Sequence, residues 1–197
     1  MKKLLVVLVA LAMLTCSVIA IAETRQETLP AYVYPGEDPI IGAVADYSSE
    51  NSSEYWDHDV ECVAIPAPVI LKTDMIDDAH ADVYGNFWVM KYKLEGTTLV
   101  CVSGGAAAGI MHLEAIDQVW KVAAVEIAGD GDDYPKDIAR FCNGDKELEK
   151  AYFNTADVKH DPLKSVRTEF IREYVETNQL PIDSYQDPYW DAEPLFE

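Results

Sequence analysis

The chain has 197 residues, 49% of them hydrophobic and 25% charged, which excludes an intrinsically disordered protein and fits one globular domain of ordinary size. Its 35 acidic residues outnumber 15 basic ones and give a formal net charge of −20 at pH 7. This charge disfavours nucleic acids and anionic membrane surfaces as partners and favours cations, basic peptides or neutral ligands, unless it serves only solubility.

The first 22 residues have the three parts of a secretory signal peptide. Two lysines open the chain, an apolar run extends from 4 to 14, and Ala20 and Ala22 stand at positions −3 and −1 of a cleavage site. A membrane-spanning helix needs roughly 20 apolar residues, so this run is too short to span comfortably. We therefore predict that 1–22 is removed and that the mature protein is secreted or extracytoplasmic, without stable membrane insertion. An uncleaved anchor and a lipid on Cys16 stay open as alternatives.

Proline and capping signals predict where the first helix begins. Residues 23–38 are polar and proline-containing, which predicts an extended leader arm ahead of a single domain at 39–197. Asp38 suits the N-cap, and Pro39 suits the first helical position. Apolar residues then recur at helical spacing over 40–47.

The middle of the chain alternates between apolar and polar residues and predicts a sheet. Pro66 and Pro68 interrupt the first strand and demand an edge position, a bulge or a bend. Glu95-Gly96 predicts a tight hairpin turn. The expected strands lie at 60–65, 69–72, 86–94, 97–102, 110–114 and 119–128.

A run of small residues at 103–109 separates two of these strands. Its glycines are compatible with an anion-binding loop, but such a loop normally leads into a helix, whereas here a strand follows. The negative net charge also opposes a phosphate ligand. We interpret the run as a flexible or bulged hairpin.

Helical patterns return after residue 134. Short helices are expected at 135–141 and 145–153, and the clearest helix runs from 162 to 177, with Asp161 as its cap and Pro162 in its first turn. The apolar stripe of that helix is predicted to cover the sheet. The whole pattern predicts an α+β fold: a curved antiparallel sheet, a meander of four or more strands, covered by N-terminal and C-terminal helices.

Three cysteines remain after cleavage, at Cys62, Cys101 and Cys142. An odd number in an oxidising compartment allows one disulfide and one free thiol, and three pairings are open. The alternative is that all three are small buried apolar residues.

Aromatic residues on the strands are candidates for a ligand pocket. Trp88, Tyr92 and Trp120 are expected to line it, with His112 as a polar group. His112 and Glu114 share one strand face, so they also form a candidate catalytic pair, or else ordinary surface residues. His58, between two aspartates, is interpreted as part of a solvated loop.

Three aspartates around Gly131 resemble a fragment of a calcium loop: Asp130, Asp132 and Asp133. A calcium-binding loop of the EF-hand type needs a glutamate at its twelfth position, and Phe141 stands there. A surface cation site and a simple acidic turn are the two interpretations left.

A resemblance to uncharacterised secreted bacterial proteins is carried by residues 84–88 (Tyr-Gly-Asn-Phe-Trp), 100–105 (Val-Cys-Val-Ser-Gly-Gly), 111–113 (Met-His-Leu) and 185–187 (Tyr-Gln-Asp). The resemblance implies no established activity. In that group the glycine turn often carries polar residues, where this chain has alanines at 106–108. The element order is also similar to NTF2-like and cystatin-like α+β folds, although the helical C-terminus departs from the NTF2-like order.

These observations lead to one main functional hypothesis and two alternatives. The main one is a secreted, non-catalytic binding module with a pocket on the curved sheet and no cofactor. The first alternative is an acidic protein that binds a basic protein partner. The second is an NTF2-like enzyme that uses His112.

Overall fold

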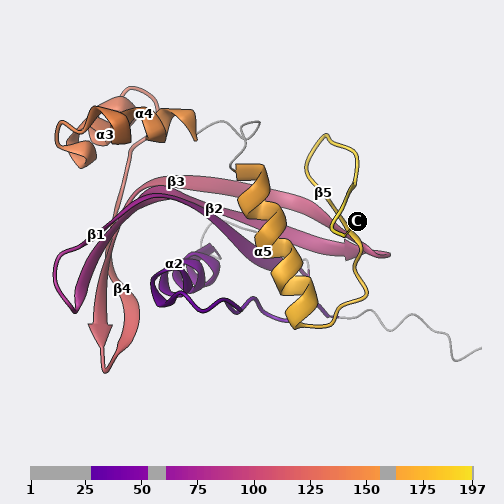
Figure 1. Cartoon of the computed structure of the whole chain (residues 1–197). Coiled ribbons are helices and arrows are strands. Elements are labelled where there is room, and N and C mark those ends of the chain that lie inside the picture. The colour runs from indigo at the N-terminus through magenta and orange to yellow at the C-terminus, as the bar shows by residue number, and fades with distance from the viewer. Residues whose placement is uncertain (1–27, 53–60, 156–162, 197) are drawn as a thin grey trace, which may run out of the picture.

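The computed structural model describes residues 28–52, 61–155 and 163–196, and confirms the predicted α+β fold with a curved antiparallel sheet (Figure 1). Residues 1–22, His58, His160, Asp161 and Pro162 lie outside the described residues. In chain order the elements are α2 (Pro39–Glu50), β1 (Val63–Met75), β2 (His80–Glu95), β3 (Thr98–Ile116), β4 (Val119–Ile127), α3 (Tyr134–Cys142), α4 (Lys146–Asn154), α5 (Leu163–Thr177), β5 (Ser184–Gln186) and β6 (Glu193–Pro194).

The sheet is an antiparallel meander of β1, β2, β3 and β4, extended by two short C-terminal strands. β3 has two further neighbours on the side away from β2: its first residues pair in parallel with β5, and its last eight pair with β4. The long strands curve and twist, so that one end of the sheet faces α5 and the other end carries the β3–β4 hairpin (Figure 1).

β1 is one continuous strand, not the two segments that its prolines predicted. Pro66 and Pro68 are tolerated because β1 pairs with β2 alone among the described strands, so the missing N–H groups need not serve a second neighbour. The expected edge position is therefore correct. A register shift between Ile70 and Lys72 adds local curvature.

β3 corrects the interpretation of the run at 103–109. No hairpin forms there; the run is the middle of a 19-residue strand, and all of residues 103–109 pair with β2. The one register shift of this pairing lies just before the run, at Val102. A run rich in glycine is typical of turns, but here the small size of glycine and alanine allows neighbouring groups to pack closely against the strand. The side chain of Met90 lies over Gly104, and the backbone of β4 crosses close to Gly109.

Side-chain caps fix the starts of two helices, and the cap at Asp38 is the one that the sequence predicted. Asp38 Oδ1 accepts hydrogen bonds from the backbone N–H groups of Ile40 and Ile41 at 2.9 and 3.1 Å. Asp145 accepts one from the N–H of Leu148 at 3.1 Å and starts α4. α5 is described from Leu163 onward, close to its expected start.

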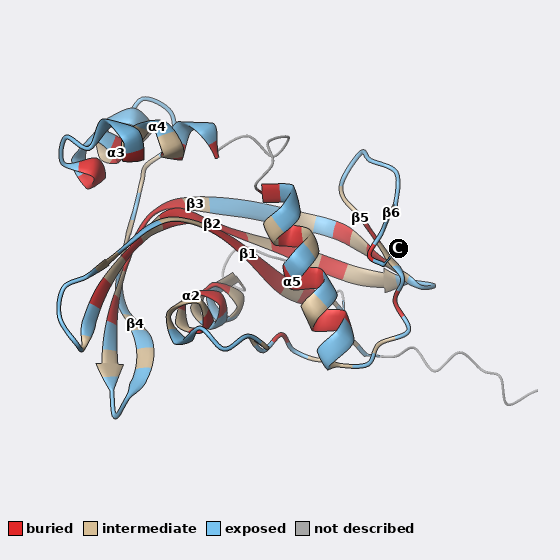
Figure 2. Cartoon of the chain, viewed as in Figure 1, coloured by how far each residue is buried: buried red, intermediate tan, exposed pale blue. Residues whose placement is uncertain are grey.

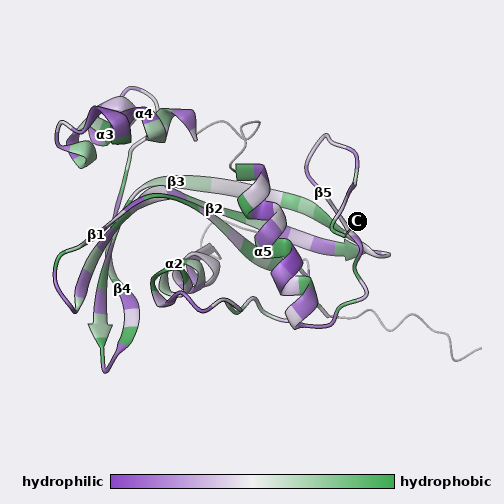
Figure 3. Cartoon of the chain, viewed as in Figure 1, coloured by the Kyte–Doolittle hydropathy of each residue, from purple (hydrophilic) through white to green (hydrophobic). Residues whose placement is uncertain are grey.

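The helices cover different parts of the sheet, and buried positions alternate with exposed ones along α5 (Figure 2). On β2, Trp88, Met90 and Tyr92 face the α5 side of the core, whereas Val83 and Phe87 pack with α2. The α3–α4 pair covers a third cluster, around Ile110 and Tyr152 (labelled elements in Figure 1). Both hydrophobic and hydrophilic positions occur on α5 (Figure 3), as expected for a helix with one buried face.

The described part of the leader arm belongs to the core. Tyr32 is buried and stacks on Phe170 and Tyr174 of α5 at centroid distances of 6.4 and 6.3 Å. The Tyr174 hydroxyl donates a hydrogen bond of 2.8 Å to the carbonyl of Pro30. No helix in the described residues is long and apolar enough to cross a membrane.

We expect Gly109→Ala to lower the free energy of unfolding by about 2 kcal/mol. The added Cβ would stand 2.0 Å from the carbonyl oxygen of Glu126, and this backbone atom cannot rotate away. Urea denaturation measures the loss. Gly104→Ala is the matched control, because its Cβ meets mainly the movable end of Met90, with the Val89 carbonyl oxygen farther off at 3.3 Å, and the loss should be smaller. Equal losses would contradict the close-approach explanation.

Candidate functional site

A pocket of about 730 Å³ lies between α5, the β2–β3 part of the sheet and the C-terminal segment. Its volume is within the usual range of small-molecule sites, roughly 300–1,000 Å³. It is lined by Trp88 and Met90 of β2, Cys101 and Gly104 of β3, Lys164 and Arg167 of α5, and Asp187, Pro188, Tyr189, Trp190 and Glu193 of the C-terminal segment.

A buried ion pair joins α5 to the C-terminal segment within this lining. Arg167 Nη2 lies 2.6 Å from Asp187 Oδ2, and the two side chains are 7% and 16% exposed. The guanidinium also sits over the ring of Tyr185, at 5.9 Å from the ring centroid. β5 brings Asp187 here, because the parallel pairing of Tyr185 with Leu99 sets where the following residue lies.

The polar atoms around this ion pair are incompletely matched. Arg167 Nε, Asp187 Oδ1 and Trp88 Nε1 are buried and have no hydrogen-bond partner among the described residues. The Tyr92 hydroxyl is also buried and unpaired; it lies close enough to Asp187 to lower the pKa of that carboxyl as a hydrogen-bond donor does, although its geometry falls short of a hydrogen bond. A buried donor or acceptor left unpaired costs about 1–3 kcal/mol, so such atoms in one place require an explanation.

A second ion pair stands at a more exposed part of the lining. Lys164 Nζ lies 2.7 Å from Glu193 Oε2, with the side chains 53% and 36% exposed. Each cation of the pocket is thus paired with a carboxylate of the C-terminal segment. The pocket walls therefore carry no net charge from these four groups.

A turn over residues 187–190 presents two aromatic side chains beside the pocket. The N–H of Trp190 donates to the carbonyl of Asp187 at 3.2 Å, with Pro188 at the second position. Tyr189, at the third position, has φ +68°, a conformation that favours glycine and costs a bulky residue about 1–2 kcal/mol. Tyr189 is nevertheless fully exposed, and Trp190 is 55% exposed. The turn thus holds a strained aromatic residue in solvent next to a pocket.

Burial controls the titration of the pocket groups. It raises the pKa of Asp187, and Glu193 adds to this, while Arg167 and Lys164 act in the opposite direction. Burial, followed by the charge of Asp187, raises the pKa of the Cys101 thiol to about 11. Cys101 is therefore protonated at neutral pH and is not an activated nucleophile.

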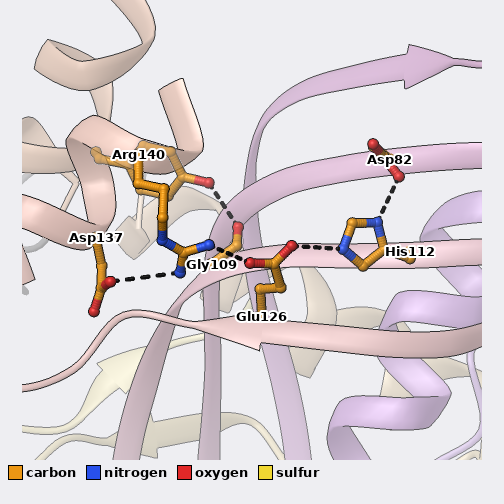
Figure 4. A network of polar contacts seen from close by, with 7 residues as sticks. Asp82, Gly109, His112, Glu126, Asp137 and Arg140 are labelled. Atoms are coloured by element: carbon orange, nitrogen blue, oxygen red, sulfur yellow. Dashed lines mark hydrogen bonds and ion pairs between the residues drawn. The ribbon is translucent and has the colours of Figure 1, made fainter. Parts of the chain in front are cut away.

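A separate polar network lies at the other end of the sheet (Figure 4). His112 Nδ1 is 2.7 Å from Asp82 Oδ1, and Nε2 is 3.2 Å from Glu126 Oε1. Glu126 also pairs with Arg140 of α3, which contacts Asp137. Burial alone lowers the pKa of His112, but the hydrogen bonds and charges of the two carboxylates outweigh it and raise the pKa. The network ties β2, β3 and β4 to α3.

The structure divides the residues predicted for one pocket between distant places. Trp88 lines the pocket, and Tyr92 is buried on the same sheet face. Trp120 packs instead at the α2 side of the sheet, and His112 belongs to the network of Figure 4. Glu114 is exposed and pairs in register with His80; the carboxylates that contact His112 are Asp82 and Glu126.

The predicted cation site does not assemble. In the described part of the chain, no three or more His, Cys, Asp or Glu side chains are grouped to hold a metal ion, and this part includes Asp130, Asp132 and Asp133. Asp133 pairs with Lys136 at 2.8 Å, and α3 begins directly after it. Cys62, Cys101 and Cys142 are all free thiols.

Sequence reasoning missed the two charged residues that define the pocket. A signal was available for Arg167: it stands four residues after Leu163 and three before Phe170, on the buried stripe of α5. A charged residue inside such a stripe predicts a buried partner. Asp187 has no comparable local signal.

Comparison with known proteins gives no match: no family model, no curated protein and no solved structure matches the chain significantly.

We expect the stability contributed by His112 to depend on pH. Because its pKa is raised on folding, its ion pairs stabilise the protein fully below the unfolded-state pKa of about 6.5, and this is lost as pH rises through the folded-state pKa. The destabilisation by His112→Gln should be about 0.5–1 kcal/mol larger at pH 5.5 than at pH 9, a small figure because solvent screens these partly exposed groups.

Urea denaturation at the two pH values measures this difference. His80→Gln is the control: its side chain is 54% exposed and contacts Asp77 alone in the described structure. If the two histidine variants showed the same pH dependence, the network around His112 would add no pH-dependent stability of its own.

The Arg167–Asp187 pair should behave as a buried pair. Arg167→Met leaves a carboxylate buried without its cation and should cost about 3 kcal/mol of unfolding free energy, while Arg167→Met with Asp187→Asn should recover most of the loss. Arg172→Met is the matched control on the same helix; it removes only a hydrogen bond to the carbonyl of Leu195. Denaturant unfolding of the wild type and these three variants tests this, and a double variant no more stable than Arg167→Met would speak against the pair.

Proposed function

We propose that the protein is a secreted, non-catalytic binding module that holds a small molecule in the pocket between α5, β2–β3 and the C-terminal segment. The observation that carries the proposal is the buried Arg167–Asp187 pair, which lines the pocket and keeps unmatched hydrogen-bonding atoms there together with Trp88. These atoms are buried just behind the lining, so a ligand that draws the side chains into hydrogen bonds with it would remove their cost. Aromatic and apolar walls with few polar groups are the usual composition of ligand sites.

The proposal favours binding over chemistry for two reasons. Inside the pocket, the Cys101 thiol is held in its protonated form, and the cations are paired with carboxylates. Outside it, both ring nitrogens of His112 contact carboxylates, so neither is available to a substrate. An enzyme that uses His112 would first have to break an ion pair.

Secretion is part of the same proposal and rests on residues 1–22. Binding of a basic protein, the alternative partner, rests on the net charge of −20 alone. It predicts association that weakens with added salt, whereas ligand binding in a pocket of paired charges depends on salt far less.

Thermal unfolding against a panel of small molecules tests the proposal. The panel contains neutral sugars, small carboxylates, small amines and divalent cations. One class should raise the unfolding midpoint of the wild type: a ligand at 100 times its Kd adds about 2.7 kcal/mol, or roughly 5–10 °C for a domain of this size.

The variant with Arg167→Met and Asp187→Asn should lose the shift, and Arg172→Met should keep it. If no compound raises the unfolding midpoint, or if the shift persists in the double variant, the result counts against the pocket and favours a basic macromolecular partner.

A further inference from the structure

The charges of the pocket restrict the ligand before any contact is considered. Lys164 and Arg167 are the cations of the lining, and Glu193 and Asp187 are its carboxylates, joined at 2.7 and 2.6 Å. An anionic ligand meets two carboxylates already in place, and a cationic ligand meets two cations. A neutral ligand meets neither repulsion, so the charge arrangement favours it.

The buried atoms of the pocket that lack hydrogen-bond partners include both donors and an acceptor. Arg167 Nε and Trp88 Nε1 are donors, and Asp187 Oδ1 is an acceptor. A hydroxyl group is the neutral group that both donates and accepts, and several hydroxyls on one ring present both functions along one edge. Arg167 and Trp88 line the pocket and are 6% and 8% exposed, but the unmatched atoms themselves have almost no contact with solvent. A hydroxyl therefore bonds to them, directly or through a bridging water, only when these side chains shift toward the ligand.

The aromatic residues offer the complementary surface. Tyr189 and Trp190 lie on the turn beside the pocket, and both expose their side chains. A flat aromatic face suits the apolar C–H face of a sugar ring, whose hydroxyls point outward at its edge. Tyr189 has the left-handed conformation that glycine would adopt without strain, so its exposed aromatic ring is held at a cost to the turn.

We infer that the ligand of this pocket is a neutral saccharide, bound with one ring against Tyr189 or Trp190 and with hydroxyls at Arg167, Asp187 and Trp88. This inference rests on the proposed function of the pocket. It adds the chemical class of the ligand, which that proposal leaves open.

Isothermal titration calorimetry on the intact protein tests the inference. The neutral probes are maltotriose, cellotriose, xylotriose, mannotriose and tri-N-acetylchitotriose; benzoate is the anionic probe and benzyltrimethylammonium the cationic probe. At least one neutral trisaccharide should bind, and neither charged probe should. Tyr189→Gly, which keeps the turn because glycine accepts φ +68°, should weaken binding at least tenfold.

Two further variants make the result specific to the pocket. Arg167→Met with Asp187→Asn should also weaken binding at least tenfold. Phe153→Ala removes an aromatic residue that is 45% exposed on α4, away from the pocket lining, and should leave the affinity unchanged.

Each other result overturns a defined part of the argument. Binding of a charged probe, lost in the double variant, without binding of any sugar overturns the saccharide class and leaves the pocket function standing. Sugar binding that is unchanged in Tyr189→Gly and in the double variant places the sugar elsewhere and overturns the inference. No binding by any probe overturns both the inference and the proposed function.

Discussion

The pairing of β2 with β3 is the interaction on which the rest of this structure depends. It extends from Glu95 and Thr98 at the hairpin to His80 and Glu114 at the far end. β1 uses the other side of β2, and both β4 and β5 use the other side of β3. Because side chains alternate along β2, one face meets α2 and the other meets α5 and the α3–α4 pair. A slip of one residue in this register would exchange the two faces and expose the core.

The pocket lies over the part of the β2–β3 hairpin that no described helix covers completely. β4 and β5 pair with the two ends of β3. Between these ends β3 carries glycine and alanine, whose small side chains leave space above the sheet. The chain that follows β5 turns back toward α5 and places Asp187 against Arg167. The helix contributes the cation and the tail contributes the carboxylate, so the register of the three-residue strand β5 sets where the two charges meet. A strand of only three residues thus fixes the position of the buried Asp187 carboxylate.

Local signals predicted most of the fold, and the exceptions have physical reasons. Asp38 and Pro39 identify a helix start because a cap acts over two or three residues of sequence, and the structure places the helix there. The glycine–alanine run was wrong as a turn signal because its small residues make room for the side chain of Met90 and for the β4 backbone, which are distant in sequence.

The same reasoning explains why only part of the site was predictable. Trp88 was found because strand alternation marks a buried aromatic residue. Arg167 carried a signal in the stripe of α5, but its meaning depends on Asp187, twenty residues later. The partners of His112 are another such case: Asp82 and Glu126 meet it through strand register, while Glu114 is merely its neighbour in sequence.

The polar clusters around His112 and around Arg167 are built on opposite principles, and this contrast supports the second as the proposed ligand site. Around His112 every charged group has a counterpart, and the groups are partly exposed, so the network is explained by stability alone. Around Arg167 the ion pair is buried, nearby donors and an acceptor lack partners, and Tyr189 occupies a strained backbone conformation. Each of these features lowers the stability of the empty protein. Apolar residues at 167 and 187 and a glycine at 189 would remove most of these costs, so their presence in one pocket supports the proposal of a ligand that compensates them when it binds.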